Sequence, residues 1–191
     1  MINITFIGNC QMISLCFYMQ QLFKNDKNYN ISWVLYSKDF IKHLGYWSIK
    51  CNNKIIKFDK IINRIINSDI IIYQNIKKNK SLFCNTETLN KLKKKSCKLL
   101  ILPSIYLIYD NFDISIKKLI ERENKNNVDI KVSIIFKTFR DNNLMLTNNH
   151  PNTFLFMAIL QRICYLLNLN FFTEEKFNYF NNYYNYMELP I

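Results

Sequence analysis

Short apolar runs alternate along the chain with longer segments in which apolar residues recur every three or four positions. The runs are typical of buried strands, and the recurring positions are typical of helices with one apolar face. We expect strands over 2–7, 31–36, 70–73, 99–102 and 130–136, the last with a helix as the alternative. We expect helices over 11–24, 55–67, 85–95, 114–124 and 151–168, and a short helix or irregular segment over 40–47.

This alternation of strands and helices predicts an α/β fold with a short, mostly parallel sheet flanked by helices and a helical C-terminal part. The 191 residues are 49% hydrophobic, which is enough to bury a core. No internal repeat or linker separates two parts of the chain. We therefore predict a single domain over 1–191, with a core to about residue 170 and a Tyr- and Asn-rich tail over 171–191.

The formal net charge of +12 predicts attraction to anions without naming them. Nucleic acid, membrane headgroups, phosphorylated cofactors and ordinary solvation all fit this charge. The lysines form clusters rather than one basic helix, and no nucleic-acid-binding motif occurs. We do not expect a nucleic-acid partner, although a basic nucleic-acid-binding protein stays as an alternative function.

Six cysteines occur without a C-x-x-C pair, and the two histidines lie far apart in the sequence. This spacing predicts no metal site. No apolar run approaches the ~20 residues that span a bilayer, and the N-terminus lacks the features of a signal peptide. We therefore expect no transmembrane segment and a cytoplasmic protein.

The segment Gly8-Asn9-Cys10-Gln11 joins the first predicted strand to the first predicted helix. Gly8 is one of only two glycines, and glycine permits a turn that a side chain would block. Cys10 comes at the first turn of the helix, where free N–H groups and the helix dipole favour a thiolate. This is a position for a nucleophile, and the alternative is a small buried cysteine under an ordinary turn.

Polar residues follow three of the predicted strands. In open α/β sheets ligands collect at the carboxyl ends of the strands, so these residues are predicted to share one crevice. They are Asn9, Cys10, Gln74, Asn75 and Ser104. The backbone N–H groups of Cys10 and Gln11, with the amides of Asn9, Gln74 or Asn75, are candidate donors to an oxyanion.

His150 is the candidate base for Cys10. Pro151 suits the first position of the last long helix, which predicts His150 as the N-cap of that helix. The positive potential at a helix N-terminus would keep the imidazole neutral and able to accept a proton. The alternative is a histidine that serves only as a cap or a satisfied core group.

These motifs resemble the WcbI-type polysaccharide-biosynthesis enzymes, a family of presumed acetyltransferases that act on capsular polysaccharide sugars. The matching segments are Gly8-Asn9-Cys10-Gln11, the strand ending at Gln74, Leu102-Pro103-Ser104-Ile105-Tyr106 and Thr147-Asn148-Asn149-His150-Pro151. The resemblance implies acyl transfer from acetyl-coenzyme A to a sugar or glycan hydroxyl, with Cys10 as nucleophile and His150 as base.

The chain is also similar, more distantly, to the SGNH hydrolases. Their serine corresponds to Cys10, and their acidic residue three positions before the histidine corresponds to Thr147. The group that orients His150 is therefore open among Thr147, Asn148, Asn149 and a carboxylate such as Asp110 or Asp113. A direct transfer without an acyl-enzyme, and a thioesterase or carbohydrate esterase with water as acceptor, are further alternatives.

Cations near the predicted crevice are candidates to bind the phosphates of coenzyme A, because ammonium and guanidinium groups form charge-assisted hydrogen bonds to phosphate. The candidates are Lys77, Lys78, Lys80, Arg140 and Arg162. For each of them, solvation at the surface is the alternative.

Overall fold

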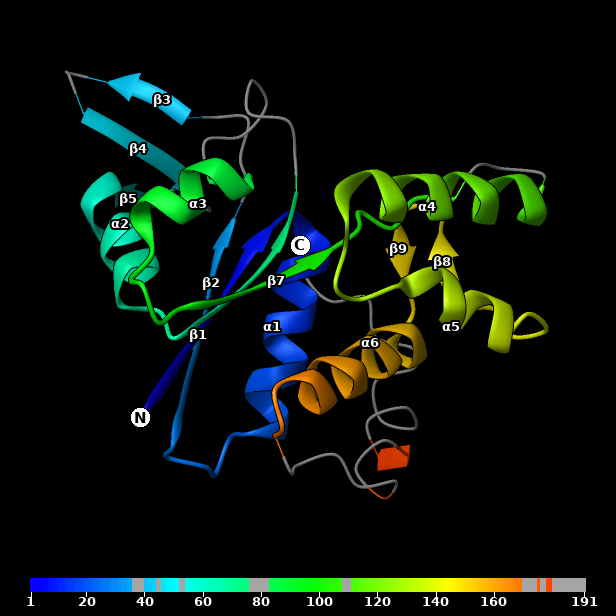
Figure 1. Cartoon of the computed structure of the whole chain (residues 1–191). Coiled ribbons are helices and arrows are strands. Elements are labelled where there is room, and N and C mark those ends of the chain that lie inside the picture. The colour runs from blue at the N-terminus through cyan, green and yellow to red at the C-terminus, as the bar shows by residue number, and fades with distance from the viewer. Residues whose placement is uncertain are drawn as a thin grey trace. The chain divides into compact units, whose positions relative to one another are not determined.

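The computed structural model of the chain describes residues 1–35, 40–43, 46–51, 54–75, 83–107, 111–169, 175, 178 and 179 (Figure 1). It contains a parallel sheet of four strands flanked by helices, which confirms the α/β fold with a mostly parallel sheet. The elements are β1 (Ile2–Gly8), α1 (Cys10–Leu22), β2 (Tyr29–Leu35), β3 (Phe40–His43), β4 (Tyr46–Cys51), β5 (Lys54–Lys57), α2 (Phe58–Asn67), β6 (Ile70–Gln74), α3 (Thr86–Leu92), β7 (Lys98–Leu102), α4 (Phe112–Asn126), α5 (Val132–Thr138), β8 (Met145–Thr147), β9 (His150–Pro151) and α6 (Thr153–Leu166).

The chain divides into two compact units. Unit 1 contains Met1–Cys16 and Lys27–Leu100, and unit 2 contains Phe17–Asp26 and Ile101–Ile191. The helix α1 and the strand β7 therefore each begin in unit 1 and end in unit 2. The single domain over 1–191 stays a prediction.

The sheet of four strands has the order β2-β1-β6-β7, and β1 is parallel to both of its neighbours. β1 is one of the two central strands, and its apolar residues Ile4, Phe6 and Ile7 are fully buried. A parallel strand with both faces covered has a nearly continuous apolar sequence, which explains why β1 and β6 are evident as apolar runs.

Asp69 fixes the start of the β1–β6 pair. Its backbone N–H donates to the Asn3 carbonyl at 2.9 Å, and its carboxylate accepts the Asn3 N–H at 2.8 Å. The carboxylate also accepts from Lys94 Nζ at 2.5 Å. The Asn3 hydrogen bond and then the Lys94 hydrogen bond lower the pKa of Asp69, because both favour its ionised form.

One of the two expectations for the segment 40–47 was a short helix, and this expectation is wrong. It contains β3 and the start of β4, which form an antiparallel sheet of three strands with β5. The predicted helix over 55–67 begins only at Phe58, because Lys54–Lys57 pairs with β4 as β5. Pairing between neighbouring strands thus overrides a weak local pattern.

In unit 2 the segment 130–136 takes the alternative to the expected strand: it is helical from Val132 onward, as part of α5. The buried carboxylate of Glu123, which lies on α4, accepts hydrogen bonds from the Ser133 backbone N–H at 2.8 Å and from the Ser133 hydroxyl. It therefore satisfies the first turn of α5, which has no cap from Lys131. This partner comes from another helix, so the local sequence does not reveal it.

The N-terminus of α6 also differs from the prediction. Asn152 is the N-cap, and its Oδ1 accepts the Leu155 N–H at 2.9 Å. His150 and Pro151 form β9, which pairs with β8 through Thr147 and His150. The predictions of His150 as N-cap and of Pro151 as the first helical residue are therefore wrong. The hairpin holds these two residues in extended backbone, and asparagine is the stronger capping residue.

Among the helices that the structure describes, none is long and apolar enough to cross a membrane.

We predict that Asn152→Ala lowers the free energy of unfolding by about 1 kcal/mol, the usual cost of losing an N-cap. Urea denaturation followed by circular dichroism measures this change. The matched variant His150→Ala should change it by less than about 0.5 kcal/mol, because His150 is outside the helix. An equal loss in both variants would contradict the assignment of the cap.

Candidate functional site

The turn between β1 and α1 places Cys10 at the first position of a helix. Asn9 caps this helix from outside: its Oδ1 accepts the Gln11 N–H at 3.0 Å, and its carbonyl accepts the Met12 N–H at 3.0 Å. No described residue accepts a hydrogen bond from the Cys10 N–H. One backbone donor at this helix N-terminus is therefore unused within the described part of the chain.

Gly8 leaves no room for a side chain at this turn. A Cβ atom on Gly8 would collide with Met12 Cγ and would lie 2.7 Å from Gln74 Oε1. Both approaches are closer than any ordinary contact, so the glycine allows the side chains of α1 and β6 to approach the backbone. This agrees with the prediction that a side chain would block the turn.

Gln74 connects the end of β6 to this turn. Its Oε1 accepts the Asn9 N–H at 3.1 Å, and its Nε2 donates to Gln11 Oε1 at 2.9 Å. Gln74 is 1% exposed and Gln11 is 3% exposed. The structure thus brings together the ends of β1 and β6, as the sequence predicts. The predicted hydrogen bonds from Gln11 or Gln74 to an oxyanion stay predictions. They would compete with the hydrogen bonds that the Gln74 amide and the Gln11 N–H already make.

Cys10 is partly exposed, whereas the other four cysteines whose side chains the structure describes are buried. These are Cys16, Cys84, Cys97 and Cys164. Burial raises the pKa of Cys16 and of Cys164 to about 12, and it also raises the pKa of Cys97. Buried thiols of this kind are protonated and unreactive at neutral pH. Cys10 is the thiol of these five that a reactant can reach.

His150 is oriented by its own hairpin in unit 2. Its Nδ1 lies 2.8 Å from Thr147 Oγ1, and the Thr147 hydroxyl donates to Asn149 Oδ1 at 3.2 Å. When the single proton of the Thr147 hydroxyl is donated to Asn149, Thr147 accepts from a protonated His150 Nδ1. This arrangement leaves Nε2 as the nitrogen that accepts a proton. Thr147 therefore contacts His150 as predicted, and its role in a reaction stays a prediction.

Two further contacts shape this part of unit 2, and one of them has no signal in the sequence. Arg122 donates from Nη1 to the Ser104 carbonyl at 3.1 Å and from Nη2 to the Tyr106 carbonyl at 2.7 Å. The Asn148 carbonyl accepts the Leu107 N–H at 2.8 Å. Arg122 thus holds the segment after β7, and a charged residue on a helix has no pattern that predicts such a contact.

The remaining predicted residues take different positions. Asn75 is partly buried after β6, while Lys77, Lys78, Lys80 and Asp110 lie outside the described residues, as does most of the tail 171–191. Arg140 forms an ion pair with the Asp113 carboxylate. Cys10 belongs to unit 1 and His150 to unit 2, and their meeting in one site stays a prediction.

Within the described ranges, no group of three histidine, cysteine, aspartate or glutamate residues could hold a metal ion. Comparisons with protein-family models, with curated proteins and with solved structures find no match to the chain. The resemblance to the WcbI-type enzymes therefore rests on the sequence motifs alone.

We predict that iodoacetamide at pH 8 alkylates Cys10 of the folded protein first. At this pH a thiol with a pKa of about 12, as for Cys16 and Cys164, has a thiolate fraction of about one in ten thousand, and burial also blocks access. Peptide mass mapping over time in a Cys51→Ser background measures the order of labelling. Labelling of Cys16 or Cys164 at the rate of Cys10 would contradict this account.

We predict that Gln74→Met lowers the free energy of unfolding by about 3 kcal/mol, because the Asn9 N–H and Gln11 Oε1 lose their partner in a buried region. Gln161→Met, at an exposed position of α6, is the control and should change it by less than about 0.5 kcal/mol. Urea denaturation of both variants tests the difference. A loss below about 1 kcal/mol for Gln74→Met would show that the amide does not fix the turn.

Proposed function

We propose that the protein transfers an acyl group from a coenzyme A thioester to a sugar hydroxyl in polysaccharide or glycan biosynthesis. The resemblance of its motifs to the WcbI-type enzymes favours an acetyl group. Cys10 is the proposed nucleophile and His150 the proposed base. The observation that carries the proposal is the partly exposed Cys10 at the first position of α1, on a turn with no room for a side chain at Gly8.

The N-terminus of α1 suits a thiolate and the charge that forms after it attacks. The positive end of the helix dipole favours negative charge on Cys10 Sγ. When Sγ bonds to the thioester carbonyl carbon, the carbonyl oxygen becomes negative, and the unused Cys10 N–H is a donor within reach of that position. The carbon–sulfur bond to coenzyme A then breaks, and the coenzyme leaves as a thiol.

The hairpin of unit 2 supplies a base with a defined proton position. With Nδ1 bonded to Thr147, the imidazole presents Nε2 to take the proton of Cys10 and to give it to the departing coenzyme sulfur. Nε2 then takes the proton of the acceptor hydroxyl as its oxygen bonds to the acyl carbon and the bond from that carbon to Cys10 Sγ breaks, and the proton returns to Sγ. The proposed orienting groups are Thr147, whose Oγ1 contacts the ring, and Asn149, whose Oδ1 accepts from the Thr147 hydroxyl. Direct activation of the hydroxyl by His150, with no acyl-enzyme, uses the same nitrogen.

The donor's phosphates need cations, and the proposal assigns them to Lys77, Lys78 and Arg140. Of these, Arg140 would have to share its guanidinium with Asp113. The five cysteines whose side chains the structure describes are all free, which agrees with the proposed reducing, cytoplasmic location, where disulfides are rare.

We expect the wild-type protein mixed with acetyl-coenzyme A to gain the mass of one acetyl group on Cys10, as measured by intact and peptide mass spectrometry. Cys10→Ala should gain none, and His150→Ala should slow the gain by about a hundredfold or more, the usual contribution of a general base. Cys51→Ser is the control and should react as the wild type does.

Adding candidate acceptor sugars to the labelled protein then separates transfer from hydrolysis. Acetylated sugar supports the proposal, and free acetate with no sugar product would make the protein a thioesterase. Full transfer by Cys10→Ala would overturn the nucleophile, and an unchanged rate in His150→Ala would overturn the base.

A further inference from the structure

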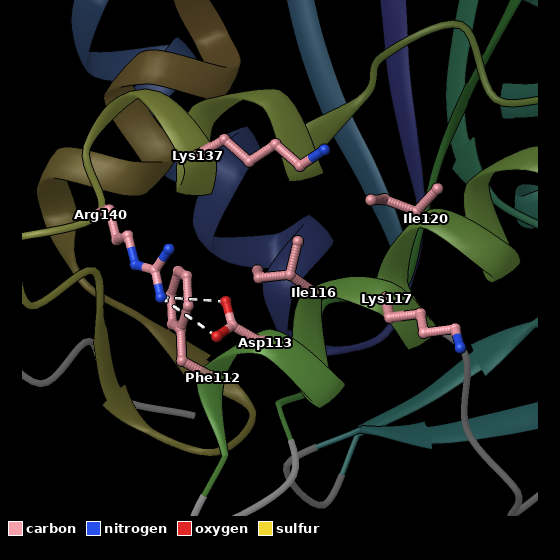
Figure 2. Close-up of a pocket in the computed structure, with 7 residues that line it drawn as sticks. All are labelled: Phe112, Asp113, Ile116, Lys117, Ile120, Lys137 and Arg140. Carbon is pink, nitrogen blue, oxygen red and sulfur yellow. Dashed lines mark hydrogen bonds and ion pairs between the residues drawn. The ribbon is translucent and has the colours of Figure 1, made fainter.

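Unit 2 contains a cavity of about 380 Å³ between α4 and the end of α5 (Figure 2). Its lining combines apolar and charged side chains, which are Phe112, Asp113, Ile116, Lys117, Ile120, Lys137 and Arg140. The volume lies within the range of small-molecule sites in proteins. The cavity does not include Cys10, Thr147 or His150, and Arg140 is the one lining residue that also has a part in the proposed function.

The floor of the cavity is apolar and held in place. Phe112, Ile116 and Ile120 recur every four residues on α4, so they lie along one face of the helix. The Phe112 ring packs edge to face against the Phe136 ring, with 6.3 Å between the two centroids. Arg140 Cζ lies over the Phe112 ring, 5.4 Å from the centroid of that ring. These two contacts hold the Phe112 ring in place at one end of the apolar floor.

The charges around this floor do not balance. Arg140 Nη2 binds both oxygens of the Asp113 carboxylate, at 3.0 and 3.1 Å, which neutralises that pair. Among the described residues, Lys117 and Lys137 have no ion-pair partner. Figure 2 shows Ile120 between these two lysines, one from each helix. Two unpaired ammonium groups therefore border an apolar surface.

We propose that this cavity binds an organophosphate, with its phosphate between Lys117 and Lys137 and its apolar body on Phe112, Ile116 and Ile120. A phosphate carries up to two negative charges and three acceptor oxygens, so it can satisfy both lysines, whereas one carboxylate neutralises one of them. The floor needs an apolar body, so free phosphate leaves it uncovered. A purine nucleotide and a prenyl phosphate share this chemistry.

Titration of the ¹⁵N-labelled full chain, followed by amide chemical shifts in buffer without divalent cations, tests the site. Adenosine diphosphate and geranyl diphosphate are the two probes, with adenosine and inorganic phosphate as controls. At least one diphosphate should bind more tightly than both controls and shift amides of α4 and α5. The probe that binds more tightly identifies the source of the phosphate.

Single variants then test the contacts. Lys117→Gln and Lys137→Gln should each weaken the bound diphosphate about tenfold, the effect of losing one charge-assisted hydrogen bond. Lys118→Gln is the matched control: Lys118 is exposed and adjacent in sequence, its replacement removes the same charge, and it is absent from the lining. Cys10→Ala, which has no thiol to acylate, should bind the diphosphate as the wild type does, so a failure of this site and a failure of the proposed function can be told apart.

Binding of neither diphosphate would overturn the proposal, and so would equal binding of inorganic phosphate. An equal loss of diphosphate affinity in Lys118→Gln would show that only the overall positive charge of the chain matters, and it would also overturn the proposed site. Because all three lysines are exposed, circular dichroism of the variants should match the wild type, so weak binding reports on contacts rather than on folding.

Discussion

The two hydrogen bonds of the buried Gln74 amide are the interaction on which the candidate nucleophile depends. They connect the end of β6 to the backbone of Asn9 and to the side chain of Gln11, away from water. Hydrogen bonds in such surroundings are strong, and leaving either partner unsatisfied is costly. Because Gly8 allows Gln74 to approach the backbone, the strand pair and the helix start form one rigid corner that presents Cys10.

His150 is positioned by a different kind of contact. The Thr147 hydroxyl contacts both Asn149 Oδ1 and His150 Nδ1. The imidazole is therefore oriented by side chains of its own hairpin, which are exposed or partly buried. Each candidate group is thus prepared within its own unit by neighbours close to it. Preparation of this kind lowers the reorganisation that a reaction would require.

The sequence predicts those parts of the fold whose causes are local. The buried runs of β1 and β6 follow from periodicity. The structure differs from the first expectation where pairing or tertiary contacts decide. The segment 130–136 takes the expected alternative, a helix, from Val132 onward beside Glu123, and the pairing of β9 with β8 leaves α6 to begin at Thr153. In the candidate site, Gly8, Asn9 and Gln74 meet as strand ends should, but the contact of Arg122 with Ser104 depends on tertiary structure alone.

The crossing of α1 and β7 between the two units has a consequence for dissecting the molecule. Neither unit is one continuous stretch, since Phe17–Asp26 interrupts the first and belongs to the second. A fragment that ends at residue 100 would contain this decapeptide without the rest of its unit. Apolar side chains such as Tyr18 and Met19, which are buried in the intact chain, would then be exposed. The complementary fragment would lack the decapeptide. Limited proteolysis near residue 100 should therefore release pieces that aggregate rather than independent folded halves.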